Sequence, residues 1–404
     1  MELLYGNAMK KYLIYLACVL GLCTVFGGLS RLSSGFSEWY AVTVYPIIVG
    51  VIGRVFGILP FSAAEFLLIL LILGGITEIV LLIIVFIKSK HDRYIRKAVL
   101  AKAGVCIACV ASTILLIYIT NCGINYNRHT FLYDKELSFK RSMSDEWLVY
   151  LTLLDEFYTF FPDDISSQIV TDDNGVFVLN GDIKVTAPAA MRSLAEKYPR
   201  LNVYFPRPKP IMLSELMTHA SLLGVYIPLT VEANYNRIAP DSEIAFSALH
   251  ELAHVAGFMR EDEANFIAFL AGKESGNPEL IYAAYLDVLQ KFSLELDSEM
   301  YENMPDKYKV MLDGFIAKSN KAEWTEDGFF YGTELVPEQI MNDWWAESSF
   351  WWERWSRSNI VIDAINDIST AANDTYLKIQ GAEDGVESYG RMFDLVIAFY
   401  LSEL

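Results

Sequence analysis

The chain has 404 residues, of which 53% are hydrophobic, and its mean hydropathy is +0.28. This composition indicates membrane segments joined to a soluble part. Residues 1–130 carry 11 Lys and Arg against 5 Asp and Glu, whereas the remaining residues carry 21 against 45. So acidic a C-terminal part excludes nucleic acid as a partner, because phosphate binding needs a basic surface.

Three apolar stretches, each nearly free of charge, predict transmembrane helices. They lie near residues 12–29, 66–87 and 99–119. Each is long enough to cross a hydrocarbon core of about 30 Å at about 1.5 Å per residue. We therefore expect a membrane anchor at residues 1–129, with the lipid bilayer as its partner, and one soluble domain at residues 130–404.

The basic loop at residues 88–97 determines the expected topology. It holds five Lys and Arg residues, so the positive-inside rule places it in the cytoplasm. A weaker apolar stretch at residues 41–59 is then expected to lie on or dip into the outer face, and the third helix delivers the C-terminal domain outside. Glu78, near the middle of the second stretch, is interpreted as a helix-packing contact, with a proton or ion role as the alternative.

The soluble domain is expected to be mainly helical, in an α+β arrangement. Helical periodicity predicts helices at residues 145–160, 187–198, 243–256, 260–272, 278–292, 305–319, 337–355, 359–376 and 388–402. Shorter runs predict strands at residues 175–179, 201–205 and 224–229. A cluster of five tryptophans at residues 344–355 is expected to be mostly core packing, with a substrate-cleft wall or a membrane-interface belt as alternatives.

The motif that carries chemistry is His250-Glu251-Leu252-Ala253-His254. On a helix, residues four apart share a face, so His250 and His254 can bind a single metal ion. Glu251 then flanks the water that a zinc ion would activate, and acts as the general base of amide hydrolysis. All five cysteines lie within the first 122 residues, so a metal ion in the C-terminal domain must be held by His and carboxylate.

A third metal ligand is expected just after Gly257, which suits the end of the motif helix. Catalytic zinc takes three protein ligands and keeps one open position. Glu261 and Glu263 are both candidates. Glu261 is favoured because it stands four residues before Asn265, which matches the Glu-x-x-x-Asp/Asn arrangement of gluzincin-type peptidases, where the Asp or Asn supports a histidine ligand. Glu263 stays the alternative ligand.

The run HELAHVAGFMREDEANFIAF at residues 250–269, the three apolar stretches and the late segment at 376–391 carry a family resemblance. Together they resemble an uncharacterised bacterial family of multi-pass membrane proteins with a C-terminal HExxH zincin-like (gluzincin-like) metallopeptidase domain. The resemblance covers most of the chain. It implies Zn²⁺ held by His250, His254 and an acidic third ligand, with Glu251 as the base. It also implies a bacterial plasma membrane location with an extracytoplasmic catalytic domain.

Further residues are candidates for contacts around the site. Tyr226 and Ile227 lie in a predicted strand about 20 residues before the motif and are candidates for binding a substrate backbone by strand addition, with a plain core strand as the alternative. Tyr389 and Arg391 are candidate catalytic contacts opposite the base. His219 is interpreted as a structural or surface histidine.

We predict a membrane-anchored zinc metallopeptidase, a hydrolase that cleaves extracytoplasmic peptides or proteins. Cleavage inside the membrane is excluded, because residues 241–270 are too charged to span lipid. The alternative is a non-catalytic binding or assembly protein with a zinc-stabilised domain. Structural zinc sites usually close with four ligands, often Cys, whereas this domain has no Cys and keeps Glu251.

Overall fold

The computed structural model describes residues 2–89, 92–133, 142–162, 165–292, 294–318, 324–325, 328–357, 360–379 and 392–403. The chain divides into two units. The first comprises residues 1–129 together with 226–232, and the second comprises residues 130–225 together with 233–404. No pattern in the sequence indicates that 226–232 belongs with the first unit.

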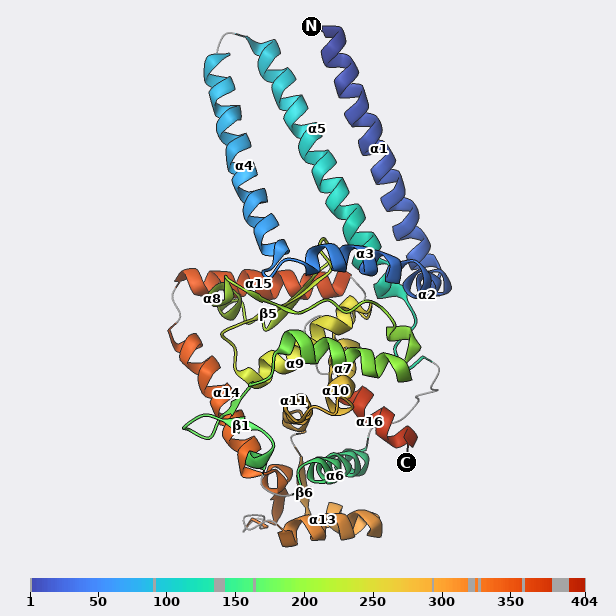
Figure 1. Ribbon diagram of the computed structural model, residues 1–404, viewed down its shortest axis with the longest axis vertical. Coiled ribbons are helices and arrows are strands. Elements are labelled where there is room, and N and C mark those ends of the chain that lie inside the picture. The colour runs from blue at the N-terminus through green and yellow to red at the C-terminus, as the bar shows by residue number, and fades with distance from the viewer. Residues whose placement is uncertain are drawn as a thin grey trace. The chain divides into compact units, whose positions relative to one another are not determined.

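The described residues of the first unit form helices joined by short turns, apart from its inserted segment. Its elements are α1 (Glu2–Leu32), α2 (Ser34–Thr43), α3 (Tyr45–Gly57), α4 (Ala63–Lys88), α5 (Arg93–Tyr118), the π-helix η1 (Ile119–Gly123) and the short η2 (Asn125–Asn127). Among the described residues, three helices are long and apolar enough to cross a membrane, and they cover Met9–Leu32, Ala63–Lys88 and Arg93–Asn127 (Figure 1). The prediction of three transmembrane helices is therefore confirmed at this level, and each helix extends beyond the apolar stretch that predicts it.

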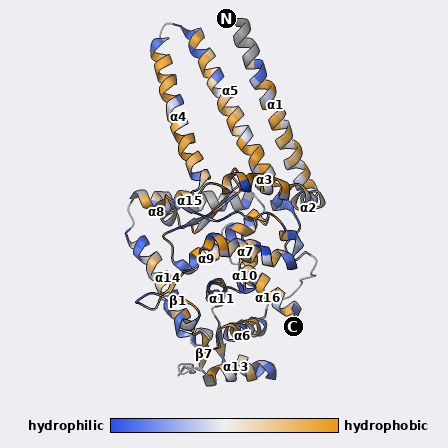
Figure 2. Cartoon of the chain, viewed as in Figure 1, coloured by the Kyte–Doolittle hydropathy of each residue, from blue (hydrophilic) through white to orange (hydrophobic). Residues whose placement is uncertain are grey.

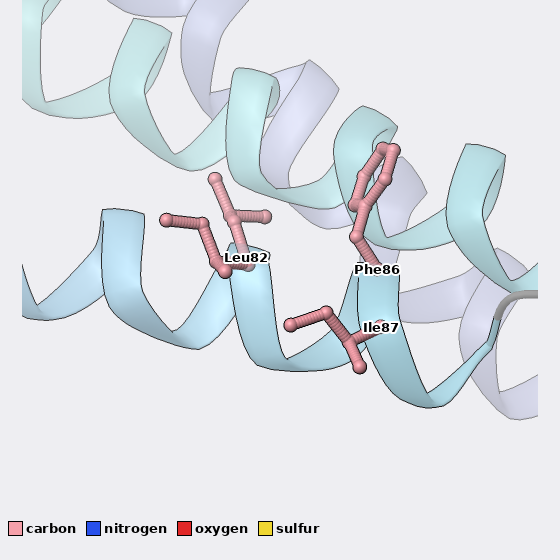
Figure 3. A pocket seen from close by; sticks show the side chains of 4 residues that line it. Leu82, Phe86 and Ile87 are labelled. Carbon is pink, nitrogen blue, oxygen red and sulfur yellow. The ribbon is translucent and has the colours of Figure 1, made fainter.

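Hydrophobic residues predominate along these three helices (Figure 2), and many of their large side chains are exposed. Nearly all of α4 is exposed, with burial confined to Ala63 and Glu65 in its first turn. A hollow on α4 is lined by Leu82, Ile83, Phe86 and Ile87, all apolar (Figure 3). Such a surface is stable against lipid chains and costly in water.

The weaker apolar stretch at residues 41–59 forms a broken helix. α2 and α3 meet at an angle of 43°, with Pro46 in the first turn of α3. The Arg54 guanidinium donates to the Gly50 carbonyl one turn earlier at 2.6 Å. Within the part of the chain that the structure describes, the candidate crossings number three, or four if the bent pair is a single crossing, so the expected orientation of the chain stays a prediction.

The inserted segment 226–232 is held by buried polar contacts inside the first unit. The Tyr226 hydroxyl lies 3.0 Å from the Tyr45 hydroxyl and donates to the Asn121 carbonyl at 3.1 Å. The Glu232 carboxylate accepts from the backbone N–H groups of Ala63 and Ala64 at 3.2 and 2.9 Å. Glu232 therefore caps the start of α4, where a negative charge is favoured.

The second unit is mainly helical. Its helices are α6 (Met143–Phe160), α7 (Ile183–Lys197), α8 (Ser214–His219), α9 (Asp241–Val255), α10 (Glu261–Lys273), α11 (Pro278–Gln290), α12 (Ser298–Asn303), α13 (Asp306–Lys318), α14 (Glu338–Ser356), α15 (Ile360–Ile379) and α16 (Met392–Glu403). Three short 3₁₀ turns are η3 (Ile165–Ser167), η4 (Pro199–Leu201) and η5 (Gly332–Leu335). The core is built on α9, which packs against α7, α10 and α11, while α10 also contacts α16 (Figure 1).

Strands are few and short. They are β1 (Val170–Thr171), β2 (Phe177–Val178), β3 (Lys209–Ile211), β4 (Gly224–Ile227), β5 (Glu232–Asn236), β6 (Glu295–Asp297) and β7 (Phe329–Tyr331). β3, β5 and β4 form a sheet in that order, with β3 parallel to β5 and Lys209 opposite Asn234. β4 is thus an edge strand of this sheet, and antiparallel pairs β1–β2 and β6–β7 form separately.

Two expectations from the sequence are wrong in detail. Residues 201–205 form no strand, because η4 ends at Leu201 and the chain turns there, with the Val203 N–H bonded to the Leu201 carbonyl. The tryptophan cluster is core only in part. Trp344 is buried, whereas Trp345, Trp352 and Trp355 on α14 are 69%, 71% and 55% exposed.

Candidate metal centre

The motif helix α9 begins and ends at clear sequence signals. Asp241 and Glu243 lie in its first turn, where carboxylates interact favourably with the helix dipole. The helix ends at Val255, and Gly257 adopts a φ of +87°, a conformation that other residues adopt only with strain. Most of the helix is buried, including Glu251 and His254, so the side chains of the motif are carried on a core helix.

His250, His254 and Glu261 converge from α9 and α10. Their candidate ligand atoms all lie within 4.8 Å of one another. The Glu261 Oε2 atom is 3.1 Å from His250 Nε2 and 3.6 Å from His254 Nε2. Two imidazole nitrogens and one carboxylate oxygen are the ligand set typical of catalytic zinc, so these residues fit the metal that the motif implies.

A hydrogen bond made by Nδ1 orients each of the two imidazole rings. The Nδ1–H of His250 donates to the Asn265 side-chain oxygen at 2.7 Å, and the Nδ1–H of His254 donates to the Phe258 carbonyl at 2.7 Å. Each bond leaves the Nε2 lone pair directed at the centre, as metal-binding histidines require. Asn265 therefore lies where the sequence placed a supporting residue. The hydrogen bond to the Phe258 carbonyl was not predicted from the sequence. The signal that could have indicated it is Gly257, because this residue turns the chain just before Phe258.

The electrostatics of the cluster favour a cation between the three side chains. Burial alone would lower the pKa of His254, but the Glu261 and Glu251 carboxylates and the hydrogen bond to the Phe258 carbonyl together outweigh burial and raise that pKa to about 9. Burial would likewise raise the pKa of Glu261, but the two imidazoles outweigh it and hold the Glu261 pKa well below its usual range. The site thus stabilises positive charge, whether it is carried by a proton or by a metal ion.

The two candidate third ligands have different surroundings. Glu261 faces the histidines, as described above. Glu263 is 4% exposed, and its Oε1 accepts a short hydrogen bond from the Phe131 backbone N–H. The ring of Phe131 packs edge-on against Phe258 and Phe266, so Glu263 serves to fix the segment that enters this unit.

Glu251 lies beside the convergent group. It is 4% exposed, and its carboxylate is close enough to contribute to the raised pKa of His254. One turn earlier on the same face of α9 is Ser247, which is also buried. The start of β4 runs over this face, because a side chain added at Gly224 would collide with both Ser247 and Glu251.

The remaining predicted site residues are not members of this convergent group, or they lie outside the described residues. Tyr226 uses its hydroxyl inside the first unit, and Ile227 is half-buried at the end of the edge strand β4. His219 ends α8 and is not in the convergent group found among the described residues. Tyr389 and Arg391 lie outside the described residues.

Comparison with known proteins gives a family but no function. No curated protein and no solved structure matches the chain. A family model described as "Protein of unknown function (DUF3810)" matches residues 40–397, which include both the transmembrane helices α4 and α5 and the convergent His250, His254 and Glu261. The chain therefore belongs to the DUF3810 family.

Proposed function

We propose that this protein is a membrane-anchored zinc metallopeptidase that hydrolyses extracytoplasmic peptides or proteins. The observation that carries the proposal is the convergence of His250, His254 and Glu261, with each imidazole oriented by a hydrogen bond on its far side. We further propose that the second unit is a zincin-like domain of the gluzincin type, because its ligands come from a His-x-x-x-His helix and the helix that follows it.

Three protein ligands favour a catalytic site over a structural one. Among the described residues, the convergent group has three members, and structural zinc sites normally use four. Zinc bound to these residues would supply Lewis acidity to a substrate carbonyl and an attacking water. Glu251 would accept the proton of that water on its carboxylate and pass it to the leaving amine, a role for which its position beside the first histidine suits it.

The test of catalysis is the zinc content and peptide turnover of the full chain in detergent, compared with Glu251→Gln. The substitution keeps the shape of the side chain but removes its basicity. We expect zinc to stay bound and turnover of a peptide library to fall by roughly 10² to 10⁴. Unchanged cellular and enzymatic activity of Glu251→Gln would instead point to the non-catalytic role of a zinc-stabilised binding or assembly protein.

The test of the ligand set is a matched pair on α10. Glu261→Ala should lose zinc, as should His250→Ala and His254→Ala, because each removes one of three ligands. Glu263→Ala should largely keep zinc, because the Glu263 carboxylate bonds the Phe131 backbone. Metal content by mass spectrometry of the purified variants gives the answer, and the reverse pattern would make Glu263 the ligand.

A further inference from the structure

The first strand residue of β4 lies in direct contact with the proposed general base. An ideal Cβ atom built on Gly224 would lie 2.4 Å from Glu251 Oε1, 2.8 Å from Glu251 Cγ and 2.5 Å from Ser247 Oγ. Real Cβ contacts are almost never shorter than 3.0 Å. The edge strand therefore reaches this face of α9 only because residue 224 has no side chain.

The collision cannot be relieved by turning the carboxylate alone. Rotation about the last bond of Glu251 would move Oε1 away, but Cγ lies in the stem of the side chain and moves only if χ1 changes. Glu251 is 4% exposed and Ser247 5% exposed, so both have little free space around them. A methyl group at residue 224 would thus move the Glu251 side chain as a whole.

We propose that Gly224 is a positioning residue that sets where the Glu251 carboxylate lies. Because Gly224 has no Cβ atom, the Glu251 side chain can occupy the space next to its Cα. This contact holds the Glu251 carboxylate against the start of the edge strand β4. The catalytic consequence of this role rests on the proposed function, since a base displaced by about 1 Å typically costs on the order of 10² in rate. The contact itself does not depend on that function.

The experiment combines Gly224→Ala with two changes at Glu251 and measures two properties. In the wild-type background, Gly224→Ala should keep its zinc and change KM by less than about threefold, while kcat falls on the order of 10²-fold. In the Glu251→Gln background, Gly224→Ala should change kcat by less than about threefold, because the base it acts through is already absent. Gly314→Ala on α13 is the matched control, since a Cβ at Gly314 meets no atom within 4 Å.

The second property is thermal stability, which requires no turnover. Gly224→Ala should lower the Tm by several degrees in the wild type and by clearly less in Glu251→Ala, which removes two of the three colliding atoms. Equal Tm losses in both backgrounds would overturn the positioning role. Coupled Tm losses in a protein without Glu251-dependent turnover would support the contact and overturn the proposed function, so the two failures are distinguishable.

Discussion

The buried Glu347 and the half-buried Glu243 join α14 to the motif helix α9 and make a pH dependence of stability predictable. The Ser242 hydroxyl donates to Glu347 Oε1 at 2.6 Å, and the Trp351 indole N–H donates to Glu243 Oε1 at 2.8 Å. Burial, reinforced by the nearby Glu243 and by Asp287 and Asp343, raises the pKa of Glu347 from 4.5 to about 8. Burial and Asp287 raise the pKa of Glu243 to about 7, against the opposing effects of the Trp351 hydrogen bond and Lys291.

The sign of the effect follows from these directions. In the unfolded chain both groups lose their protons near pH 4.5, whereas in the folded chain they keep them to about pH 7 and 8. These two groups therefore stabilise the folded state most at acidic pH, and their contribution falls as pH rises through 4.5 to 8. At about 1.4 kcal/mol per pKa unit, the shift of Glu347 corresponds to a loss of a few kcal/mol, or roughly 5 to 15 °C in Tm.

The assay is thermal unfolding of the detergent-solubilised chain at pH 5, 7 and 9, followed by tryptophan fluorescence. Glu347→Gln keeps an oxygen that can accept from Ser242, so it should flatten the pH dependence and raise the Tm at pH 9. The matched control is Glu353→Gln on the same helix, because Glu353 is exposed and pairs with Arg357 one turn away. A slope in Glu347→Gln equal to that of the wild type would refute the reasoning.

Four further predictions address topology, the metal centre and the two units. A reporter fused after residue 92 should lie in the cytoplasm and one fused after residue 135 outside it; the same side for both would refute the three-helix topology. Asn265→Ala should weaken zinc binding by roughly 10- to 100-fold in chelator competition, because His250 loses its orienting bond, and unchanged affinity would contradict that role. Gly257→Ala should cost about 1 to 2 kcal/mol, seen as a lower Tm, because its φ is +87°; an unaltered Tm would be inconsistent with this strain. Glu232→Ala should destabilise the first unit by about 1 kcal/mol or more in detergent melts, because the Ala63 and Ala64 N–H groups at the start of α4 lose their acceptor, and equal stability would argue against this role.

The sequence predicts most helices because their signals are local. Apolar length identifies the three membrane helices, and helical periodicity identifies α9 to α11 to within a few residues. The sequence does not predict elements whose structure depends on contacts with residues far away along the chain. β5 was not predicted, because its residues Glu232–Asn236 do not read as a strand without the neighbours β3 and β4. The prediction that the tryptophans of α14 are mostly buried was wrong for the same reason, because residue spacing alone does not show which face of a helix packs against another element.

The candidate metal centre likewise has a part that local sequence signals predict and a part that depends on distant residues. The candidate ligands and the residues that hydrogen-bond to the two histidines all lie between His250 and Asn265. Helix geometry alone brings His250 and His254 to one face, so the spacing of residues in the sequence predicts this part of the centre. The spacing of Glu261 to Asn265 favours Glu261 locally, but the hydrogen bond that Glu263 accepts from the Phe131 backbone joins residues more than a hundred positions apart and is encoded by no local pattern. The covering of Glu251 by Gly224 is non-local too, because it requires an edge strand to pass over α9. A His-Glu-x-x-His motif therefore predicts where a metal can bind, whereas how its base is held depends on segments that only the fold brings to it.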